Sequence, residues 1–509
     1  MNTKPVRVRF APSPTGPLHL GGVRTALYNA LFARHHGGQL ILRIEDTDQT
    51  RFVSTAEAYI LDSFAWCGIT FDEDVIKGGP YAPYKQSERS AIYREYVQQL
   101  IANGTAYYGF DTEEELSARR EELKSQKITF QYDGRSRMNM KNSLTFSPEE
   151  TAAWLASGKP YVIRLKVPEG EVIRFSDLIR GDIEVHTENM DDKVLFKSDG
   201  LPTYHLANVV DDHLMEITHV IRGEEWLPSA PLHVLLYHSF GWKESMPQFA
   251  HLPLILKPDG NGKLSKRDGD RLGFPVFPLA WTDPLSCETS RGYREYGFLP
   301  EAFINMLALL GWNPGHDKEL MDWDELTGLF SIDRIGKSGA KFDWEKAKWF
   351  NHQYMQKKSD EELAALLEPD LEKNGIHADL DFVKKVCGLI RERIFLIPDL
   401  WTNACFFFRP PAAYDEHVAQ KIWKPGTGEL VLDFAENAAL LTEWTPDSIH
   451  ELVQKFTAEK EVKMGQLMNP LRLLIVGSNQ GPGMMDLAAL LGKEEFMDRV
   501  KRGVMALGK

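Results

Sequence analysis

Two short segments of this 509-residue chain combine glycine with imidazole or cationic side chains in patterns suited to phosphate chemistry. The first is PLHLGG, residues 17–22, in which His19 can donate a hydrogen bond to a phosphate oxygen. Gly21 and Gly22 let a ligand approach the backbone closely, and the helical pattern that follows would offer free N–H groups at its start. An ordinary helix start that carries a surface histidine would have the same sequence pattern.

The second segment is GKLSKR, residues 262–267, which places three cations within five residues. Flanking glycines at 260 and 269 would keep such a loop mobile. A mobile cationic loop suits closure over a triphosphate and stabilisation of charge on a leaving group. The alternative is an ordinary solvated basic turn.

The elements around the first segment predict a parallel sheet. Residues 6–11 alternate as a strand, residues 20–33 repeat apolar side chains at helical spacing, and residues 39–44 form a second apolar strand. Strand, helix and strand together make a βαβ unit, and the turn after its first strand is where such sheets bind phosphates. The pattern changes at about residue 106 and resumes with expected strands at 203–210 and 217–221 and a helix at 230–240.

The remainder of the chain has two further regions. Between residues 106 and 200 a polar helix at 112–126 is followed by strand patterns at 161–167 and 182–186, which predicts an α+β insertion. Beyond residue 341 helical patterns dominate. The fold class expected is therefore α/β with an inserted domain, followed by an all-α half.

Composition fits a globular protein, with 43% hydrophobic and 26% charged residues. The four cysteines form no CxxC pair, so neither a disulfide framework nor a Cys-rich zinc site is expected. No apolar run reaches the ~18 residues of a membrane span, and no signal-peptide pattern precedes the first strand. We expect a cytoplasmic protein without a membrane partner. With a net charge of −14, any polyanion must bind at local basic patches.

Together the two segments resemble the paired signatures of class I aminoacyl-tRNA synthetases. Four further blocks are similar to glutamyl-tRNA synthetases and appear in the family's order: RFAPSPTG at 9–16, RIEDTD at 43–48, YHLAN at 204–208 and VIRGEEW at 220–226. The resemblance implies ATP-dependent activation of L-glutamate to glutamyl-adenylate, then transfer to the 3′-terminal adenosine of tRNA(Glu). It also implies Mg²⁺ with the ATP, and a monomer. A non-discriminating form that also charges tRNA(Gln) is the alternative.

The family's architecture maps onto this chain in five parts. A Rossmann-like catalytic domain occupies 1–105 and 201–255, and an acceptor-stem-binding domain is inserted at 106–200. A stem-contact region with the KLSKR loop follows at 256–340, and an α-helical anticodon-binding domain at 341–509. Some members carry a zinc cluster in the insertion, but no cysteine lies between Cys67 and Cys287, so zinc is not expected.

The resemblance also implies roles for individual residues. His19, Lys263 and Lys266 are the expected catalytic residues, and ATP is expected to bind at His19, Gly21, Gly22, Lys263, Ser265 and Lys266. Glutamate is expected to contact Arg9, Ala11, Ser13, Glu45, Tyr204, Asn208, Arg222 and Trp226. Within that set Glu45 would pair with the ammonium, and Arg9 and Arg222 with carboxylates. No protein ligand is assigned to a metal.

Candidate tRNA contacts come from basic clusters. Arg135 and Arg137 are expected at the acceptor stem, and Arg391 and Arg393 near the anticodon; the alternative for each is a solvated helix face. The apolar segment 274–290 has no expected function.

Related classes fit less well. A glutaminyl enzyme would leave Arg222 partly unpaired against an amide, and a glutamyl-queuosine enzyme lacks the helical half. A small-molecule nucleotidyltransferase would not need that half, and a non-catalytic RNA-binding paralogue would be expected to lose His19 or Lys266.

Overall fold

The computed structural model describes residues 5–508 and divides them into two compact units. The first unit runs to residue 295 and resumes over 303–344. The second takes in 296–302 and the chain from residue 345 onward.

The predicted strand–helix–strand start is confirmed. β1 (Arg7–Phe10) pairs in parallel with β2 (Gln39–Leu42), and α1 (Leu20–His35) connects them. The helix buries an apolar face that includes Val23, Leu27 and Leu31. This βαβ unit places the loop of residues 11–19 at the carboxyl end of β1, where ligands bind in parallel sheets.

A second sheet lies beside β1 and is formed by strands from later in the chain. β8 (His219–Gly223) and β9 (Gln248–Leu252) are parallel, and β5 (Val172–Asp177) and β6 (Gly181–His186) extend the order to β6-β5-β9-β8. The Thr218 N–H donates to the Arg7 carbonyl at 2.9 Å, which sets β1 alongside β8. The hairpin β5–β6 lies within the residues expected to form the insertion, yet it pairs with the sheet that carries the site.

The expected strand at 203–210 is wrong, because this segment is helical. α6 spans Tyr204–Leu214. Leu206, Val209 and Val210 are buried at spacings of three and four, which a helix satisfies as well as a buried strand does. The adjacent polar residues of α6 are buried as well and reach the site described below.

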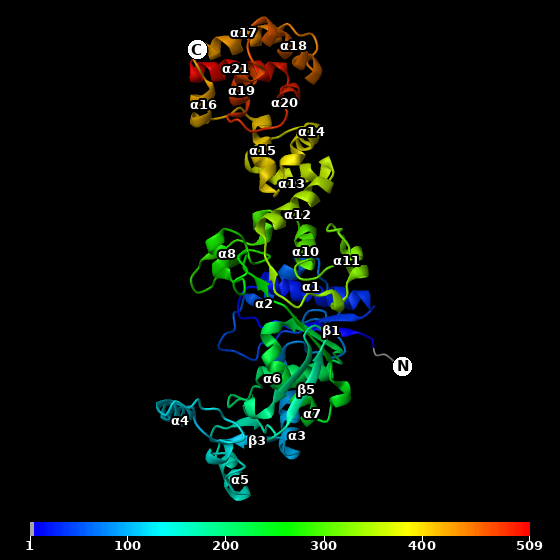
Figure 1. Cartoon of the computed structure of the whole chain (residues 1–509), viewed down its shortest axis with the longest axis vertical. Helices are drawn as coiled ribbons and strands as arrows, with labels where there is room; N and C mark the ends of the chain where they lie inside the picture. Colours follow the sequence, from blue (N-terminus) through cyan, green and yellow to red (C-terminus); the bar gives the residue numbers. More distant parts are fainter. Residues whose placement is uncertain (1–4, 509) are drawn as a thin grey trace. The chain divides into compact units, whose positions relative to one another are not determined.

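The rest of the expected insertion forms a smaller sheet. β3 (Ala106–Gly109), β4 (Val162–Leu165) and β7 (Val194–Phe196) are ordered β3-β4-β7, and β4 pairs antiparallel with both neighbours. α4 (Glu113–Ser125) and α5 (Pro148–Ala156) each begin with a capping box, at Thr112 and Ser147. Figure 1 draws both helices at the outer end of this segment, near β3.

Three helices pack together beside strands β5 and β9. α3 (Ser90–Ala102) and α7 (Ala230–Ser239) pack with α6 and share a buried core with β5 and β9. Residues 255–344 add further short elements: β10 (Ile255–Leu256), α8 (Lys266–Leu272), β11 (Trp281–Thr282), β12 (Thr289–Ser290), α11 (Trp323–Leu329) and β13 (Ala340–Lys341).

The second unit is helical, as predicted. Its main helices are α12 (Trp344–Lys357), α13 (Asp360–Lys373), α14 (Leu380–Ile390), α15 (Pro398–Phe408), α16 (Glu416–Ile422), α17 (Thr427–Ala439), α18 (Pro446–Glu459), α19 (Met464–Val476), α20 (Met484–Leu491) and α21 (Lys493–Leu507). All of them except α16 contribute buried residues to one apolar core. Among residues 5–508, no helix is both long and apolar enough to cross a membrane.

Candidate active site

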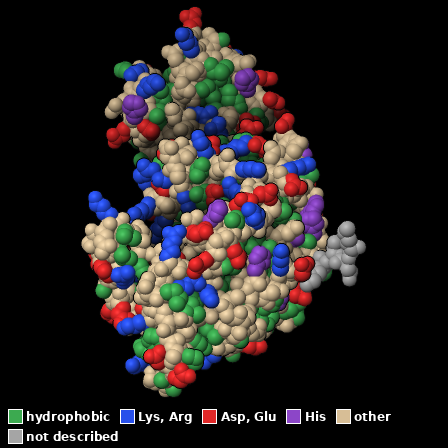
Figure 2. Space-filling view, turned by 60° about the horizontal axis from the view of Figure 1, so that its bottom comes forward, with side chains coloured by type: hydrophobic (Ala, Val, Ile, Leu, Met, Phe, Trp, Pro, Cys, Tyr) green, Lys and Arg blue, Asp and Glu red, His purple; other side chains and the backbone are tan. Residues whose placement is uncertain are grey.

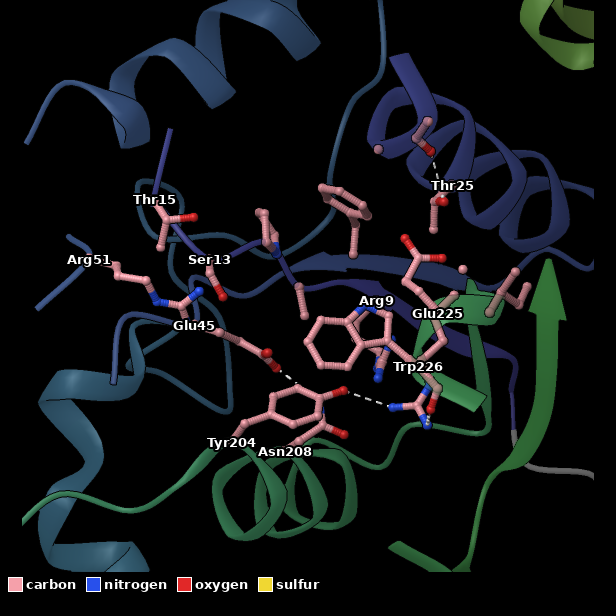
Figure 3. Close-up of a pocket in the computed structure, with 18 residues that line it drawn as sticks. Arg9, Ser13, Thr15, Thr25, Glu45, Arg51, Tyr204, Asn208, Glu225 and Trp226 are labelled. Atoms are coloured by element: carbon pink, nitrogen blue, oxygen red, sulfur yellow. Dashed lines mark hydrogen bonds between the residues drawn. The ribbon is translucent and has the colours of Figure 1, made fainter. Parts of the chain in front are cut away.

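A cavity of about 340 Å³ opens at the carboxyl ends of β1 and β8. Its lining comes from the loop after β1, the start of α1, the residues after β2, the helix α6 and the turn after β8. Figure 3 shows side chains from these elements converging on it. All eight residues expected to contact glutamate line this cavity: Arg9, Ala11, Ser13, Glu45, Tyr204, Asn208, Arg222 and Trp226.

Buried ion pairs support one wall of the cavity. Asp212 of α6 accepts hydrogen bonds from Arg9, at 3.0 and 3.1 Å, and from Arg43 at 2.7 Å. Although burial opposes ionisation, these two guanidinium groups hold the pKa of Asp212 below its ordinary value. Arg9 is therefore fixed by a charged partner inside the protein, and only its remaining N–H groups are available to a ligand.

Glu45 is oriented in a similar way. Its Oε1 atom accepts from Arg43 and from the Asn208 amide, each at 2.9 Å. Its Oε2 atom has no hydrogen-bond partner within the described chain, residues 5–508. Burial raises the pKa of Glu45, against the effect of Arg43 and Arg9. A cationic ligand group at Oε2 would offset this desolvation.

Arg222 differs from the other buried arginines of the site. Its Nε, Nη1 and Nη2 atoms donate to His251 Nε2 at 3.0 Å, to the Tyr204 hydroxyl at 2.8 Å and to the Trp226 carbonyl at 3.3 Å. It pairs with no carboxylate among residues 5–508, although only 5% of the residue is exposed. Burial lowers the pKa of Arg222, which reflects the cost of this charge. A buried guanidinium with unspent N–H groups calls for an anionic ligand.

Aromatic groups close the same end of the cavity. The Trp226 and Tyr204 rings lie 4.6 Å apart between centroids, and Trp226 is 43% exposed rather than part of the core. Burial raises the pKa of Tyr204 to about 12, so its hydroxyl is protonated at neutral pH.

His19 occupies the N-cap position of α1 and faces a second cavity, of about 410 Å³. Its Nδ1 atom accepts from the Gly21 N–H at 3.2 Å, which leaves the proton on Nε2. That Nε2 atom is buried without a partner among the described residues. Burial, and then the charge of Lys263, lower the pKa of His19 to about 4. His19 is therefore a neutral imidazole whose Nε2–H has no hydrogen-bond partner among the described residues.

The second cavity brings together most of the expected ATP residues. His19, Gly21, Gly22, Lys263 and Ser265 line it, and Lys266 does not. A Cβ atom at Gly22 would lie 2.6 Å from Leu18 Cδ1, so the Leu18 side chain would have to shift to admit one. The two cavities share Gly21, Gly22, Thr25, Gly223 and Glu225, so they adjoin.

The lysines of the KLSKR segment have different partners. Lys263 pairs with Glu225 at 2.9 Å. Lys266 opens α8, and its ammonium lies 6.0 Å from the centroid of the Phe277 ring.

Segment 274–290, which had no expected function, packs over the start of α1. The Val276 carbonyl accepts from the Leu20 N–H at 2.8 Å, and the Phe277 ring lies edge-on to His19, with centroids 6.3 Å apart. Leu279 accepts from the Tyr59 hydroxyl at 2.7 Å. Phe277 is thus next to both signature segments. Only its apolar character marked it in the sequence, and that character did not reveal which surface it covers.

The four candidate tRNA contacts differ in how exposed their side chains are. Arg135 and Arg393 are exposed. The expectation that Arg137 contacts tRNA is wrong, because its side chain is buried. It lies 3.1 Å from Asp192 and donates a hydrogen bond to the Val167 carbonyl. Arg391 is partly buried and binds Asp360 together with two backbone carbonyls, so it stabilises the turn after α14.

A third cavity, of about 580 Å³, lies in the smaller sheet and was missed by sequence reasoning. It combines aromatic and basic side chains, with Arg164 stacked over Tyr132 at 3.9 Å. Tyr204 lines both this cavity and the first. Its lining residues come from separate stretches of the chain, so no local sequence pattern marked the cavity.

Acidic and basic side chains are interspersed over the face in Figure 2, and Lys and Arg gather around the hollow at its left. The net charge of −14 therefore coexists with local positive patches. No group of three His, Cys, Asp or Glu side chains that could hold a metal ion occurs among residues 5–508.

Comparison with known proteins gives a consistent picture. Residues 5–349 match the catalytic domain of class I tRNA synthetases (E and Q), and residues 362–504 match an anticodon binding domain. Glutamate–tRNA ligases of Phocaeicola vulgatus and Bacteroides fragilis are 58% and 57% identical over 508 residues, the whole of each chain. A crystal structure of a glutamate tRNA ligase from Elizabethkingia meningosepticum, in complex with its amino acid, has a TM-score of 0.95 and 48% identity over 99% of this chain and 100% of that one.

Proposed function

The chain belongs to the glutamate–tRNA ligases of the class I aminoacyl-tRNA synthetase family, and we propose that the two adjoining cavities hold its glutamate and its ATP. The enzyme activates L-glutamate with ATP and joins it to tRNA(Glu). The proposal rests chiefly on one observation: Arg222 is buried, has N–H groups to spare and pairs with no carboxylate in residues 5–508.

Glutamate fits the first cavity through two charged contacts, with its α-carboxylate directed at the second cavity. Its side-chain carboxylate binds Arg222, where a guanidinium can offer two parallel hydrogen bonds. Its ammonium binds Oε2 of Glu45, the carboxylate oxygen without a partner among the described residues. Its α-carboxylate points toward Gly21 and Gly22, the boundary with the second cavity.

ATP fits the second cavity with its phosphates at the start of α1. His19 donates Nε2–H to a phosphate oxygen, and the free N–H groups of the helix start add partial positive charge. Lys263 and Lys266 stabilise the pyrophosphate as it leaves. Lys266 must move from Phe277 to do so, and Gly260 and Gly262 in the loop before α8 can permit this movement.

When Mg²⁺ is bound with ATP, it neutralises part of the negative charge of the phosphates. Sites of this kind hold Mg²⁺ mainly through phosphate oxygens and water, so they need no protein cage. Glu225, which pairs with Lys263, is the one carboxylate among the residues shared by both cavities and is the residue that would hold such an ion.

The first chemical step is an in-line attack of the α-carboxylate on the α-phosphorus, which releases pyrophosphate and forms glutamyl-adenylate. The second is attack of the 2′-hydroxyl of the terminal adenosine on the activated carbonyl, which releases AMP. Neither step needs a covalent protein nucleophile, so catalysis consists of positioning and charge stabilisation.

The tRNA acceptor end approaches through the third cavity. Aromatic and basic side chains suit an unpaired strand, because bases stack on rings while cations bind phosphates. Residues 106–200 then serve the acceptor stem and residues 341–509 the anticodon. Nothing in the names of the relatives favours charging of tRNA(Gln).

We expect the enzyme to work as a monomer in the cytoplasm, beside its tRNA substrate. Aminoacylation of purified tRNA(Glu) and tRNA(Gln) with glutamate and ATP tests the function. We expect tRNA(Glu) to be charged and Lys266→Ala to lose most of this activity. A folded protein that charges neither tRNA would refute the proposal.

A further inference from the structure

Behind Arg222 a buried chain of side chains leads away from the glutamate cavity. The Arg222 Nε–H donates to His251 Nε2 at 3.0 Å, and His251 Nδ1 lies 2.6 Å from Asp177 Oδ2. The side chains of His251 and Asp177 are wholly buried, and neither residue lines the cavity. They can therefore influence a ligand only through Arg222.

The positions of the protons in this chain follow from donor chemistry. A guanidinium can only donate, so His251 Nε2 must carry a lone pair and the imidazole proton must sit on Nδ1. The Nδ1–H then donates to the Asp177 carboxylate. Burial lowers the pKa of His251, which keeps the ring neutral.

Asp177 is itself rigidly placed. It ends β5, where its Oδ1 atom accepts backbone N–H groups from Ile179 at 2.9 Å and Arg180 at 2.8 Å. Although burial opposes ionisation, hydrogen bonds from His251 and this backbone hold the pKa of Asp177 below its ordinary value. An ionised, fixed carboxylate thus dictates the tautomer of His251.

We propose that Asp177 and His251 are positioning residues that set the preference for glutamate over glutamine by fixing the plane of Arg222. This inference rests on the proposed function, in which Arg222 binds the side-chain carboxylate. Five N–H groups belong to a guanidinium, and three are spent on His251, Tyr204 and Trp226. A carboxylate can accept both of the remaining N–H groups. An amide presents its own NH₂ to one of them and leaves that N–H unpaired.

Asp177→Asn tests the inference with little change in shape. The remaining Oδ1 of the asparagine keeps its three backbone hydrogen bonds, from Ile179, Arg180 and His251, so its NH₂ faces His251 Nδ1. The ring must then carry its proton on Nε2, opposite the Arg222 Nε–H, and two donors oppose each other. We expect the glutamate KM to rise and the ratio of kcat/KM for glutamate over glutamine to fall by about tenfold or more, with the KM for ATP unchanged.

Asp74→Asn is the matched control, because Asp74 is also buried and accepts two backbone N–H groups, from Ile76 and Lys77, but lies away from Arg222. It should leave the ratio unchanged. A folded Asp177→Asn enzyme with the wild-type ratio would overturn the inference. So would a variant that loses kcat for both amino acids equally, because that is the result of a merely structural role.

Two further measurements keep the test decisive if Asp177→Asn does not fold. His251→Gln retains an acceptor for Arg222 and should keep more of the ratio than His251→Leu; equal losses would count against the inference. Nitrogen-15 NMR of the histidine-labelled wild-type protein should find His251 protonated on Nδ1 and not on Nε2, and the opposite tautomer would overturn the inference outright. Failure of the wild-type enzyme to charge tRNA(Glu) would instead refute the proposed function.

Discussion

Asp212 accepts two nearly parallel hydrogen bonds from Arg9, at 3.0 and 3.1 Å, whereas Arg222 on the same cavity has no carboxylate partner in residues 5–508. Arg9 is therefore neutralised before a ligand arrives, and Arg222 is not. The cavity thus holds one unsatisfied buried cation at one end and one unsatisfied carboxylate oxygen, Oε2 of Glu45, at the other. A ligand with a carboxylate and an ammonium at matching positions satisfies both.

Replacing the ammonium-binding carboxylate should weaken glutamate binding selectively. Glu45→Gln removes the charge while keeping an acceptor, so we expect the glutamate KM to rise about tenfold to a hundredfold, as for loss of a charged hydrogen bond. The KM for ATP should stay within about twofold. Steady-state aminoacylation kinetics check this. Glu57→Gln, which breaks a partly exposed pair with Lys85, is the control. An equal rise in both KM values would contradict the assignment.

Phe277 should act on the ATP side of the site. Its ring contacts the His19 region and lies beside Lys266, so Phe277→Ala should loosen both signature segments. We expect the KM for ATP to rise roughly fivefold or more, and the glutamate KM to change little. Leu285→Ala, at a residue 94% exposed in the same segment, should behave like the wild type. If the KM for ATP is unchanged in Phe277→Ala, the packing of Phe277 does not contribute to ATP binding.

Substitution of Arg137 should destabilise the protein, whereas substitution of its neighbour Arg135 should not. Arg137→Ala leaves Asp192 buried without its cation, which should cost about 3–5 kcal/mol in the free energy of unfolding. Arg135→Ala should change that free energy by less than about 0.5 kcal/mol, because its side chain is exposed. Urea unfolding of both variants provides the comparison. Equal losses would mean that the burial of Arg137 has no energetic consequence.

The third cavity should matter for tRNA alone. Arg164→Ala removes a cation that stacks on Tyr132, so we expect weaker tRNA(Glu) binding and a shallower dependence of affinity on salt, by about one phosphate contact. Binding measured at several salt concentrations, alongside ATP and glutamate KM values, tests this. If the tRNA affinity and its dependence on salt are unchanged, the acceptor end does not bind in this cavity.

Acidic conditions should destabilise the protein through histidines that are buried neutral. The pKa of His205 is lowered to about 4, by burial and then by Lys193 and Arg222, from an ordinary value of 6.5. Between these pH values the unfolded chain binds more protons than the folded one, so the free energy of unfolding falls as pH drops from 6.5 toward 4. Urea unfolding at pH 7 and pH 5 should show a smaller loss for His205→Gln than for the wild type. Identical losses would contradict this account.

Much of the site could be predicted from sequence, because its residues lie in short blocks beside recognisable elements. Glu45 and His19 stand directly after a strand and before a helix, and both reach a cavity. The expected strand at 203–210 failed because an apolar run with β-branched residues fits a buried helix equally well. Its helical form is what directs Tyr204 and Asn208 to the same cavity.

Other features depend on contacts between distant parts of the chain. The burial of Arg137 requires Asp192, more than fifty residues away, and no local pattern distinguishes it from the exposed Arg135. The link between Asp177 and His251 likewise joins two strands that meet only in the folded sheet. The apolar character of segment 274–290 did not predict which surface Phe277 covers, because that surface is set by the fold.

Selection between glutamate and glutamine by Arg222 tests the central claim most directly. Arg222→Gln should be assayed for aminoacylation of tRNA(Glu) with each amino acid, beside the wild type and Arg174→Gln, which alters an exposed arginine of β5. We predict that kcat/KM for glutamate falls about a hundredfold or more while that for glutamine falls far less, because only the carboxylate loses its charged partner. If Arg222→Gln retains the wild-type preference for glutamate, Arg222 does not bind the side-chain carboxylate and this account of the site is wrong.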